Sequence, residues 1–139
     1  MQRAQDGRTR VRVTRLGVAA LAVAVTLGVS GCGLVQSCEE RNAAILETAA
    51  GAVESSGAPL ALLAAHDACG DSDPTMVRMR YEVPAGAGDA VSDALAAAGW
   101  GRSSQEEGVW IVEEHGVRVF VEQVSSVEVV VSAHSLTES

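Results

Sequence analysis

Residues 66–73 contain the densest group of side chains that could bind a cation. His66 and Asp67 are adjacent, and Asp71 and Asp73 follow closely. Carboxylate oxygens are the ligands that Ca²⁺ prefers, and a nearby imidazole would suit a transition metal. The segment lacks the ligand spacing, the Gly and the terminal Glu of an EF-hand loop. The sequence therefore favours a solvated acidic loop, with a small cation- or ligand-binding module centred on residues 66–73 as the alternative.

Motifs for catalysis are absent from the sequence. It has no Gly-x-Ser-x-Gly, His-Glu-x-x-His, Ser-x-x-Lys or P-loop pattern, and no Lys that could form a Schiff base. The acidic pairs Glu106–Glu107 and Glu113–Glu114 cannot act together in a strand, because adjacent side chains point to opposite faces. We expect a non-enzymatic protein without a cofactor. A hydrolase whose site is assembled from distant residues is a further alternative, for which the sequence suggests no nucleophile.

The charge of the chain is unevenly distributed along its 139 residues. Residues 1–31 contain five Arg and one Asp, whereas residues 32–139 contain five Arg and 17 acidic residues. The whole chain has a formal net charge of −8. A nucleic-acid-binding protein needs clustered cations to neutralise phosphates, so the acidic region argues against a nucleic acid partner.

The N-terminal region has the features of a secretory signal peptide at residues 1–31. Five Arg precede an apolar run at Leu16–Val29, which is shorter than the roughly 20 residues that a membrane-spanning helix needs. The sequence Val29-Ser30-Gly31-Cys32 that ends it resembles the lipobox of bacterial lipoproteins. With this lipobox-like sequence and no Lys, the chain resembles small actinobacterial lipoproteins. An ordinary signal peptide with an incidental Cys32 and an uncleaved anchor helix are the alternatives.

The lipobox resemblance implies that Cys32 receives a diacylglycerol group and becomes the first residue of the mature protein. The protein would then be held on the extracytoplasmic face of the cell membrane by its lipid anchor. Residues 32–36 would be the lipidated cysteine and a tether, and four extended residues reach only about 14 Å. The folded region would therefore lie close to the membrane surface.

The two other cysteines, Cys38 and Cys69, would remain in a compartment where disulfides persist. If Cys32 is lipidated, they form the only intramolecular pair. The chain has no Cys-x-x-Cys motif and no His at zinc-finger spacing, so we expect a structural disulfide.

Periodicity and capping signals predict two helices, at about 38–55 and 88–98. Ser37 and Glu40 fit a capping box at the start of the first, and Gly57 and Pro59 end it. Gly99 closes the second. The apolar positions expected to face the core in the first helix are Ala43, Leu46, Ala49, Ala50 and Val53.

Alternating hydrophobicity predicts a strand at 76–83, and three more at 109–114, 117–124 and 127–134. The apolar residues 60–65 could form a strand or a helical turn, and we favour a strand. Strands joined by hairpins, with only two helices, indicate an α+β fold: two helices packed on a mainly antiparallel four- or five-stranded sheet. Residues 37–136 would form this single α+β domain.

Tight two-residue turns at His115-Gly116 and Ser125-Ser126 would make both faces of the last three strands apolar. One face would include Trp110, Val119 and Val130, and the other Phe120 and Val131. Either a helix or a loop covers each face, or a bulge shifts the register, or one face binds a partner. Our first functional hypothesis is a lipid-anchored envelope protein that acts by protein–protein contact through an apolar sheet face.

Overall fold

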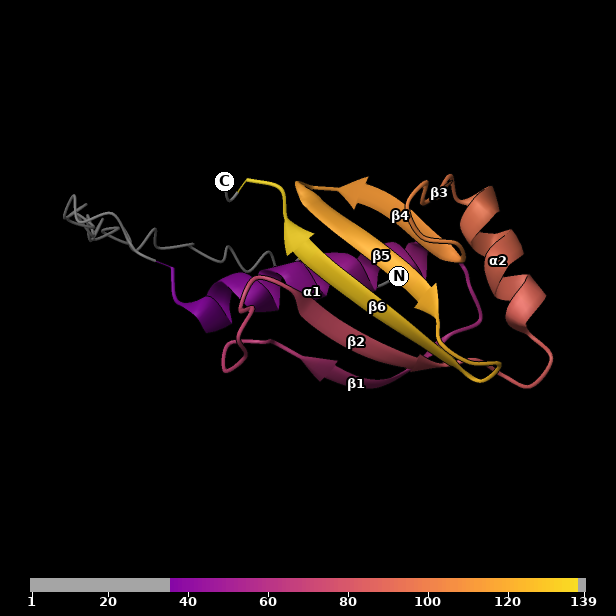
Figure 1. Cartoon of the computed structure of the whole chain (residues 1–139), viewed down its shortest axis with the longest axis horizontal. Helices are drawn as coiled ribbons and strands as arrows, with labels where there is room; N and C mark the ends of the chain where they lie inside the picture. The colour runs from indigo at the N-terminus through magenta and orange to yellow at the C-terminus, as the bar shows by residue number, and fades with distance from the viewer. Residues whose placement is uncertain (1–35, 138–139) are drawn as a thin grey trace, which may run out of the picture. The chain divides into compact units, whose positions relative to one another are not determined.

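A computed structural model of the chain describes residues 36–137 (Figure 1). The predicted signal peptide, Cys32 and all of the tether except Gln36 lie outside the described residues. Neither helix in residues 36–137 is both long enough and apolar enough to cross a membrane.

The fold is α+β, as predicted, with two helices and a six-stranded antiparallel open sheet. The helices are α1 (Cys38–Ser55) and α2 (Gly88–Ala97). The strands are β1 (Ala61–His66), β2 (Val77–Glu82), β3 (Gly101–Arg102), β4 (Val109–Glu114), β5 (Val117–Gln123) and β6 (Glu128–Ser135), in the spatial order β1-β2-β6-β5-β4-β3. The two-residue β3 adds a strand beyond the four or five expected.

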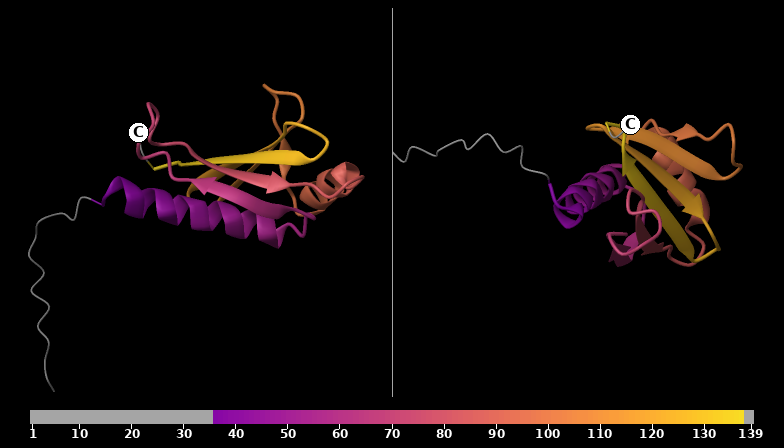
Figure 2. Two further views of the ribbon diagram at one scale, coloured as in Figure 1. Left: turned by 90° about the horizontal axis from the view of Figure 1, so that it is seen from below. Right: turned by 60° about the vertical axis from the view of Figure 1, so that its left-hand side comes forward.

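Helix α1 begins at the predicted capping box. The Ser37 hydroxyl accepts a hydrogen bond from the Glu40 amide, and the Glu40 carboxylate accepts one from the Ser37 amide, both at 3.2 Å. The helix packs along one face of the sheet against β2, β4, β5 and β6 (Figure 2, left). Its predicted core face is partly wrong, because Ala43 is exposed. The buried residues are Asn42, Ile45, Ala49, Ala52 and Val53.

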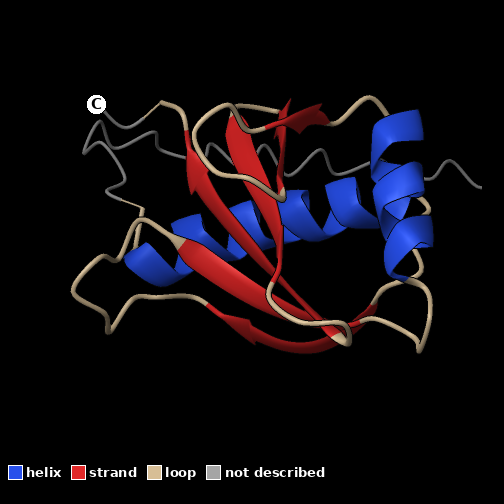
Figure 3. Cartoon of the chain, turned by 45° about the vertical axis from the view of Figure 1, so that its right-hand side comes forward, coloured by secondary structure: helices blue, strands red, loops and turns tan. Residues whose placement is uncertain are grey.

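Helix α2 lies at one end of the sheet (Figure 3). It contributes Val91 and Leu95 to the same hydrophobic core that α1 covers. Both helices therefore contribute to one core, which is centred on the face of the sheet that carries Val77, Met79 and Tyr81 of β2.

The β4–β5 hairpin has the predicted two-residue turn. Glu114 pairs with Val117, and His115 and Gly116 have φ values of 49° and 76°. Positive φ at both central positions is typical of a type I′ turn, whose twist matches that of the flanking strands.

The β5–β6 pairing differs from the predicted two-residue turn by one residue. Val121 pairs with Val131 instead of Val130, and the amides of Val124 and Ser125 both donate to the carbonyl of Glu128. A shift of one residue moves every side chain of a strand to the opposite face. The expected face assignments for β6 are therefore wrong: Val131 lies in the core, and Val130 lies on the outer face.

Candidate functional site

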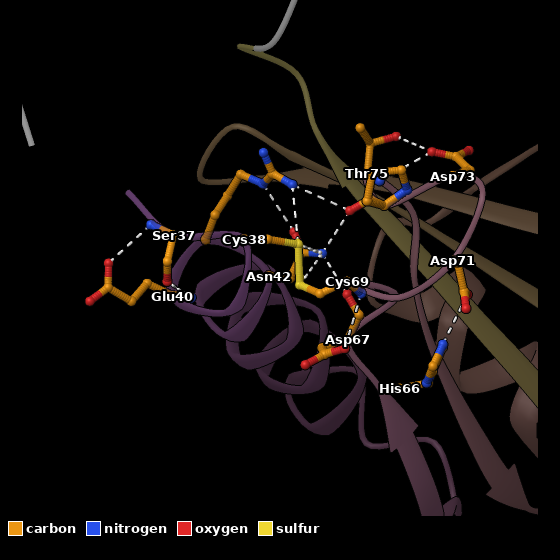
Figure 4. Close-up of a disulfide and its surroundings, with 12 residues drawn as sticks. Ser37, Cys38, Glu40, Asn42, His66, Asp67, Cys69, Asp71, Asp73 and Thr75 are labelled. Carbon is orange, nitrogen blue, oxygen red and sulfur yellow. Dashed lines mark hydrogen bonds and ion pairs between the residues drawn. A yellow bond between two sulfur atoms is a disulfide. The ribbon is translucent and has the colours of Figure 1, made fainter. Parts of the chain in front are cut away.

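The loop between β1 and β2 is joined to the start of α1 by the predicted disulfide (Figure 4). Cys38 lies in the first turn of α1 and Cys69 in the loop, and their Cα atoms are 5.8 Å apart. The bond connects residues that are 31 positions apart in the chain. This bridge fixes the acidic segment relative to the helix.

Asn42 is a second connection between α1 and this loop. Its side chain is fully buried, and its amide nitrogen donates to the carbonyls of Asp67 and of Pro74, the latter at 2.7 Å. Its side-chain oxygen accepts from Nε of Arg41 at 3.0 Å. Sequence reasoning missed this residue. The available signal was a polar side chain four positions after Cys38, on the same side of the helix.

His66 and Asp71 pair with each other at the end of β1. The His66 Nε2 atom lies 2.9 Å from a carboxylate oxygen of Asp71, and both side chains are exposed. An exposed side-chain contact of this kind contributes little to stability.

Asp67 and Asp73 bind backbone and hydroxyl donors within the loop instead of facing His66. Asp67 accepts from the amide of Cys69 at 3.1 Å, and Asp73 accepts from both the amide and the hydroxyl of Thr75. The bond from the Thr75 hydroxyl, followed by the bond from its amide, lowers the pKa of Asp73. Over residues 36–137, no group of three or more His, Cys, Asp or Glu side chains is arranged to hold a metal ion. The structure does not gather His66, Asp67, Asp71 and Asp73 around one point.

The outer face, which we define as the side of the sheet opposite α1, has an apolar strip across β4, β5 and β6. Val109 is 4% exposed, and Ile111, Phe120 and Val130 are half-buried. No helix packs on this strip within the described chain. The loop at residues 103–108 rises from this side instead (Figure 2, left). One face is thus covered by α1 and the other only in part by a loop, which answers the question raised by the two apolar faces.

Two shallow hollows lie along the apolar strip. One has a volume of about 240 Å³ and the other about 380 Å³, and they share Glu106, Val109 and Phe120 as walls. The first also includes Arg78 and Glu122, so its rim has charges of both signs. Such a surface has an apolar centre and a polar edge, the arrangement found in protein–protein interfaces.

Two ion pairs flank the strip. The Arg80 guanidinium binds both carboxylate oxygens of Glu128, at 2.9 and 2.7 Å, and Arg118 pairs with Glu113. The first pair lowers the pKa of Glu128 and raises the pKa of Arg80, in each case chiefly through the hydrogen bonds between them. Glu113 and Arg118 are directly opposite each other in the β4–β5 hairpin, which brings their side chains together.

His134 extends the strip toward the end of β6. Its ring centroid lies 5.6 Å from that of Phe120. Its Nδ1 atom is buried and has no hydrogen-bond partner among the described residues. A buried nitrogen without a partner is uncommon in folded proteins, and it lies next to the apolar strip.

A separate hollow of about 390 Å³ lies between α2 and the sheet. The guanidinium of Arg102 is 3.9 Å from the ring centroid of Trp110 at this point, a cation–π contact. Glu107 and Glu122 also line the hollow, so its charges are mixed and favour no one class of small ligand.

No protein-family model matches the chain, and the comparisons with curated proteins and with solved structures give no match either.

Proposed function

We propose that this chain is a lipid-anchored, extracytoplasmic envelope protein of non-enzymatic type that binds a partner protein through its outer face. The observation that carries the proposal is the apolar strip of Val109, Ile111, Phe120 and Val130, which no helix in residues 36–137 covers. Ion pairs at the two sides of the strip supply the polar rim that a reversible interface needs.

Support for the anchor comes from the N-terminal sequence. Five Arg, a short apolar run and the lipobox-like residues before Cys32 occur together. Two acyl chains give stable anchoring where one gives only marginal binding, and a diacylglyceryl cysteine carries two. The short connection to α1 would hold the folded region at the membrane surface, where a partner in the same membrane can reach it.

The charge of the mature region supports a protein partner over the lipid surface. With 17 acidic residues against five Arg in residues 32–139, this region is repelled by anionic headgroups. The apolar strip is also narrow and bordered by charged side chains. Such a patch favours a complementary protein surface over insertion into lipid.

Site-specific photo-crosslinking in the native envelope tests the proposal. A photoreactive amino acid replaces Glu122, which lines the outer face, or Glu47, an exposed residue of α1, as the matched control. We expect one defined crosslinked protein from position 122 and none from position 47, with loss of the product when Phe120 is also changed to Glu. Equal labelling from both positions would refute the docking role.

The anchor has its own test. The Cys32→Ser variant should leave the membrane fraction, and the mass of the native protein should begin at a lipid-modified Cys32. A native protein that retains its leader, or has a free thiol at position 32, would refute the anchor without deciding the role of the outer face.

A further inference from the structure

The edge strand β1 is the most exposed apolar element of the described chain. Every one of its six residues is exposed, and Leu62 and Leu63 are 54% and 53% exposed. It forms one border of the sheet and pairs only with β2 (Figure 1). The other border is β3, which has only two residues and places Arg102 over Trp110.

β1 lacks most features by which proteins protect a sheet edge. Such edges are usually short, charged, interrupted by Pro or bent by a bulge. Residues 61–65 contain no charge and no Pro. Of the protecting features, the strand has only a β-bulge or irregularity between Leu62 and Ala64, where Leu63 has no pairing partner in β2. The outward backbone N–H and C=O groups of β1 are therefore open to pairing with another extended segment.

An apolar groove runs beside this edge, on the side of α1. It has a volume of about 400 Å³, and its walls include Val53, Leu60, Leu62 and Tyr81. In strand addition, backbone hydrogen bonds supply affinity, and pockets for alternate side chains supply specificity. The open edge and the groove together provide both elements.

The charges near the groove indicate what kind of strand would bind. Glu54 is the only charged residue among the groove walls, and it is exposed near the end of α1. A second copy of this chain would bring the same excess of acidic residues, 17 against five Arg in residues 32–139, and would be repelled. A strand with a basic residue at its end would instead be attracted to Glu54.

We propose that β1 accepts an extended segment of a partner protein, with apolar side chains at alternate positions and a basic residue that faces Glu54. This surface is distinct from the outer face, and the proposal depends neither on the lipid anchor nor on docking at that face. Leu62 and Leu63 become buried when the segment binds.

A synthetic peptide of alternating Val and Thr with Arg at both ends, labelled with a fluorophore, tests the proposal against the mature protein. Fluorescence anisotropy should show saturable binding, and hydrogen exchange should slow at those amides of residues 61–65 that point away from β2. The same peptide with N-methylated alternate amides should bind at least roughly tenfold more weakly, because it cannot form the backbone ladder. Replacing its Arg residues with Glu should also weaken binding.

Two protein variants serve as a matched pair. Leu63→Lys places a cation on the edge and should abolish peptide binding, whereas Val124→Lys changes a residue that is 49% exposed after β5 and should leave it intact. Both variants should unfold with unchanged cooperativity. Binding that survives Leu63→Lys, or no binding by the native protein, would overturn the proposal.

Sedimentation and vesicle-binding experiments test whether a second copy of the chain or a lipid surface binds this edge instead. Dimers that Leu63→Lys dissociates would assign β1 to self-association and overturn a foreign strand as its occupant. Binding to phosphatidylglycerol vesicles that the same variant abolishes would assign it to lipid, with the same consequence.

Discussion

Replacing Asn42 with Ala should destabilise the protein by about 2–4 kcal/mol, because it removes the side-chain amide that donates to the carbonyls of Asp67 and Pro74. The carbonyl of Asp67 loses the Asn42 donor, at a cost of about 1–3 kcal/mol. The carbonyl of Pro74 keeps a bond from Arg41 at 3.3 Å, so its loss is closer to about 1 kcal/mol. The Asn42 side chain itself is fully buried, so its truncation also removes packing contacts.

Equilibrium unfolding in urea, followed by tryptophan fluorescence, measures this loss. The two tryptophans of the chain, Trp100 and Trp110, are both buried and should report unfolding. Thr48→Ala is the control, because Thr48 lies on the same helix and bonds only to the carbonyl of Ala44 within it. That change should alter stability by less than about 0.5 kcal/mol.

A second variant separates the amide donors from the packing of the side chain. Asn42→Asp keeps the shape and the oxygen that accepts from Arg41, but it cannot donate to either carbonyl. It should cost at least as much as the Ala variant. If Asn42→Asp is neutral, or if Asn42→Ala costs less than about 1 kcal/mol, the amide bonds are not what fixes the loop and the reasoning fails.

Three further predictions follow from single features of the structure. Replacing both Cys38 and Cys69 with Ser should cost about 3–4 kcal/mol in urea unfolding, from the loop that their disulfide closes, with the circular dichroism unchanged. Burial raises the pKa of Tyr81 above its usual 10.0, and the charge of Glu54 adds a smaller contribution. The neutral phenol therefore stabilises the fold fully below pH 10.0, and this contribution is lost as the pH rises through the pKa of Tyr81 in the folded protein. Tyr81 is the only tyrosine, so phenolate absorbance follows this titration directly, and Tyr81→Phe should lessen the alkaline loss of stability; an unshifted phenolate titration would contradict this. His115→Asn should stabilise the β4–β5 turn by up to about 1 kcal/mol in thermal unfolding, because Asn tolerates positive φ better, whereas a lower melting temperature would contradict a type I′ turn.

The elements that sequence reasoning located correctly all have local signals. The capping box of Ser37 and Glu40 marks the start of α1, and the alternation in residues 77–82 marks β2 as half-buried. His115-Gly116 provides a Gly where the turn requires positive φ. Each of these signals lies within a few residues of the feature that it predicts. The disulfide pairing also followed, once Cys32 was assigned to the anchor.

The role of Asn42 could not be predicted in the same way, because its partners are distant in the chain. The carbonyls that it binds belong to residues 67 and 74, and their positions depend on the path of the loop after β1. The sequence favoured a solvated acidic loop over a binding module at residues 66–73. In the structure Asp67 and Asp73 accept from donors within the loop, whereas His66 pairs with Asp71.

The burial of apolar side chains, and not a two-residue turn at Ser125-Ser126, determines how β5 pairs with β6. Ser125-Ser126 contains no Gly or Asn, so nothing in the pair favours the positive φ that a two-residue turn requires. Three polar residues of β6, Glu128, Ser132 and His134, stand at even positions, and the observed register places them away from the core. The two-residue turn would have buried those polar side chains and exposed Val131, at a cost in transfer free energy.

The one-residue shift between β5 and β6 also leaves Val130 as the only valine of β6 on the outer face, so the proposed docking strip depends mainly on residues from β4 and β5. A substitution at Phe120 should therefore weaken docking more than one at Val130.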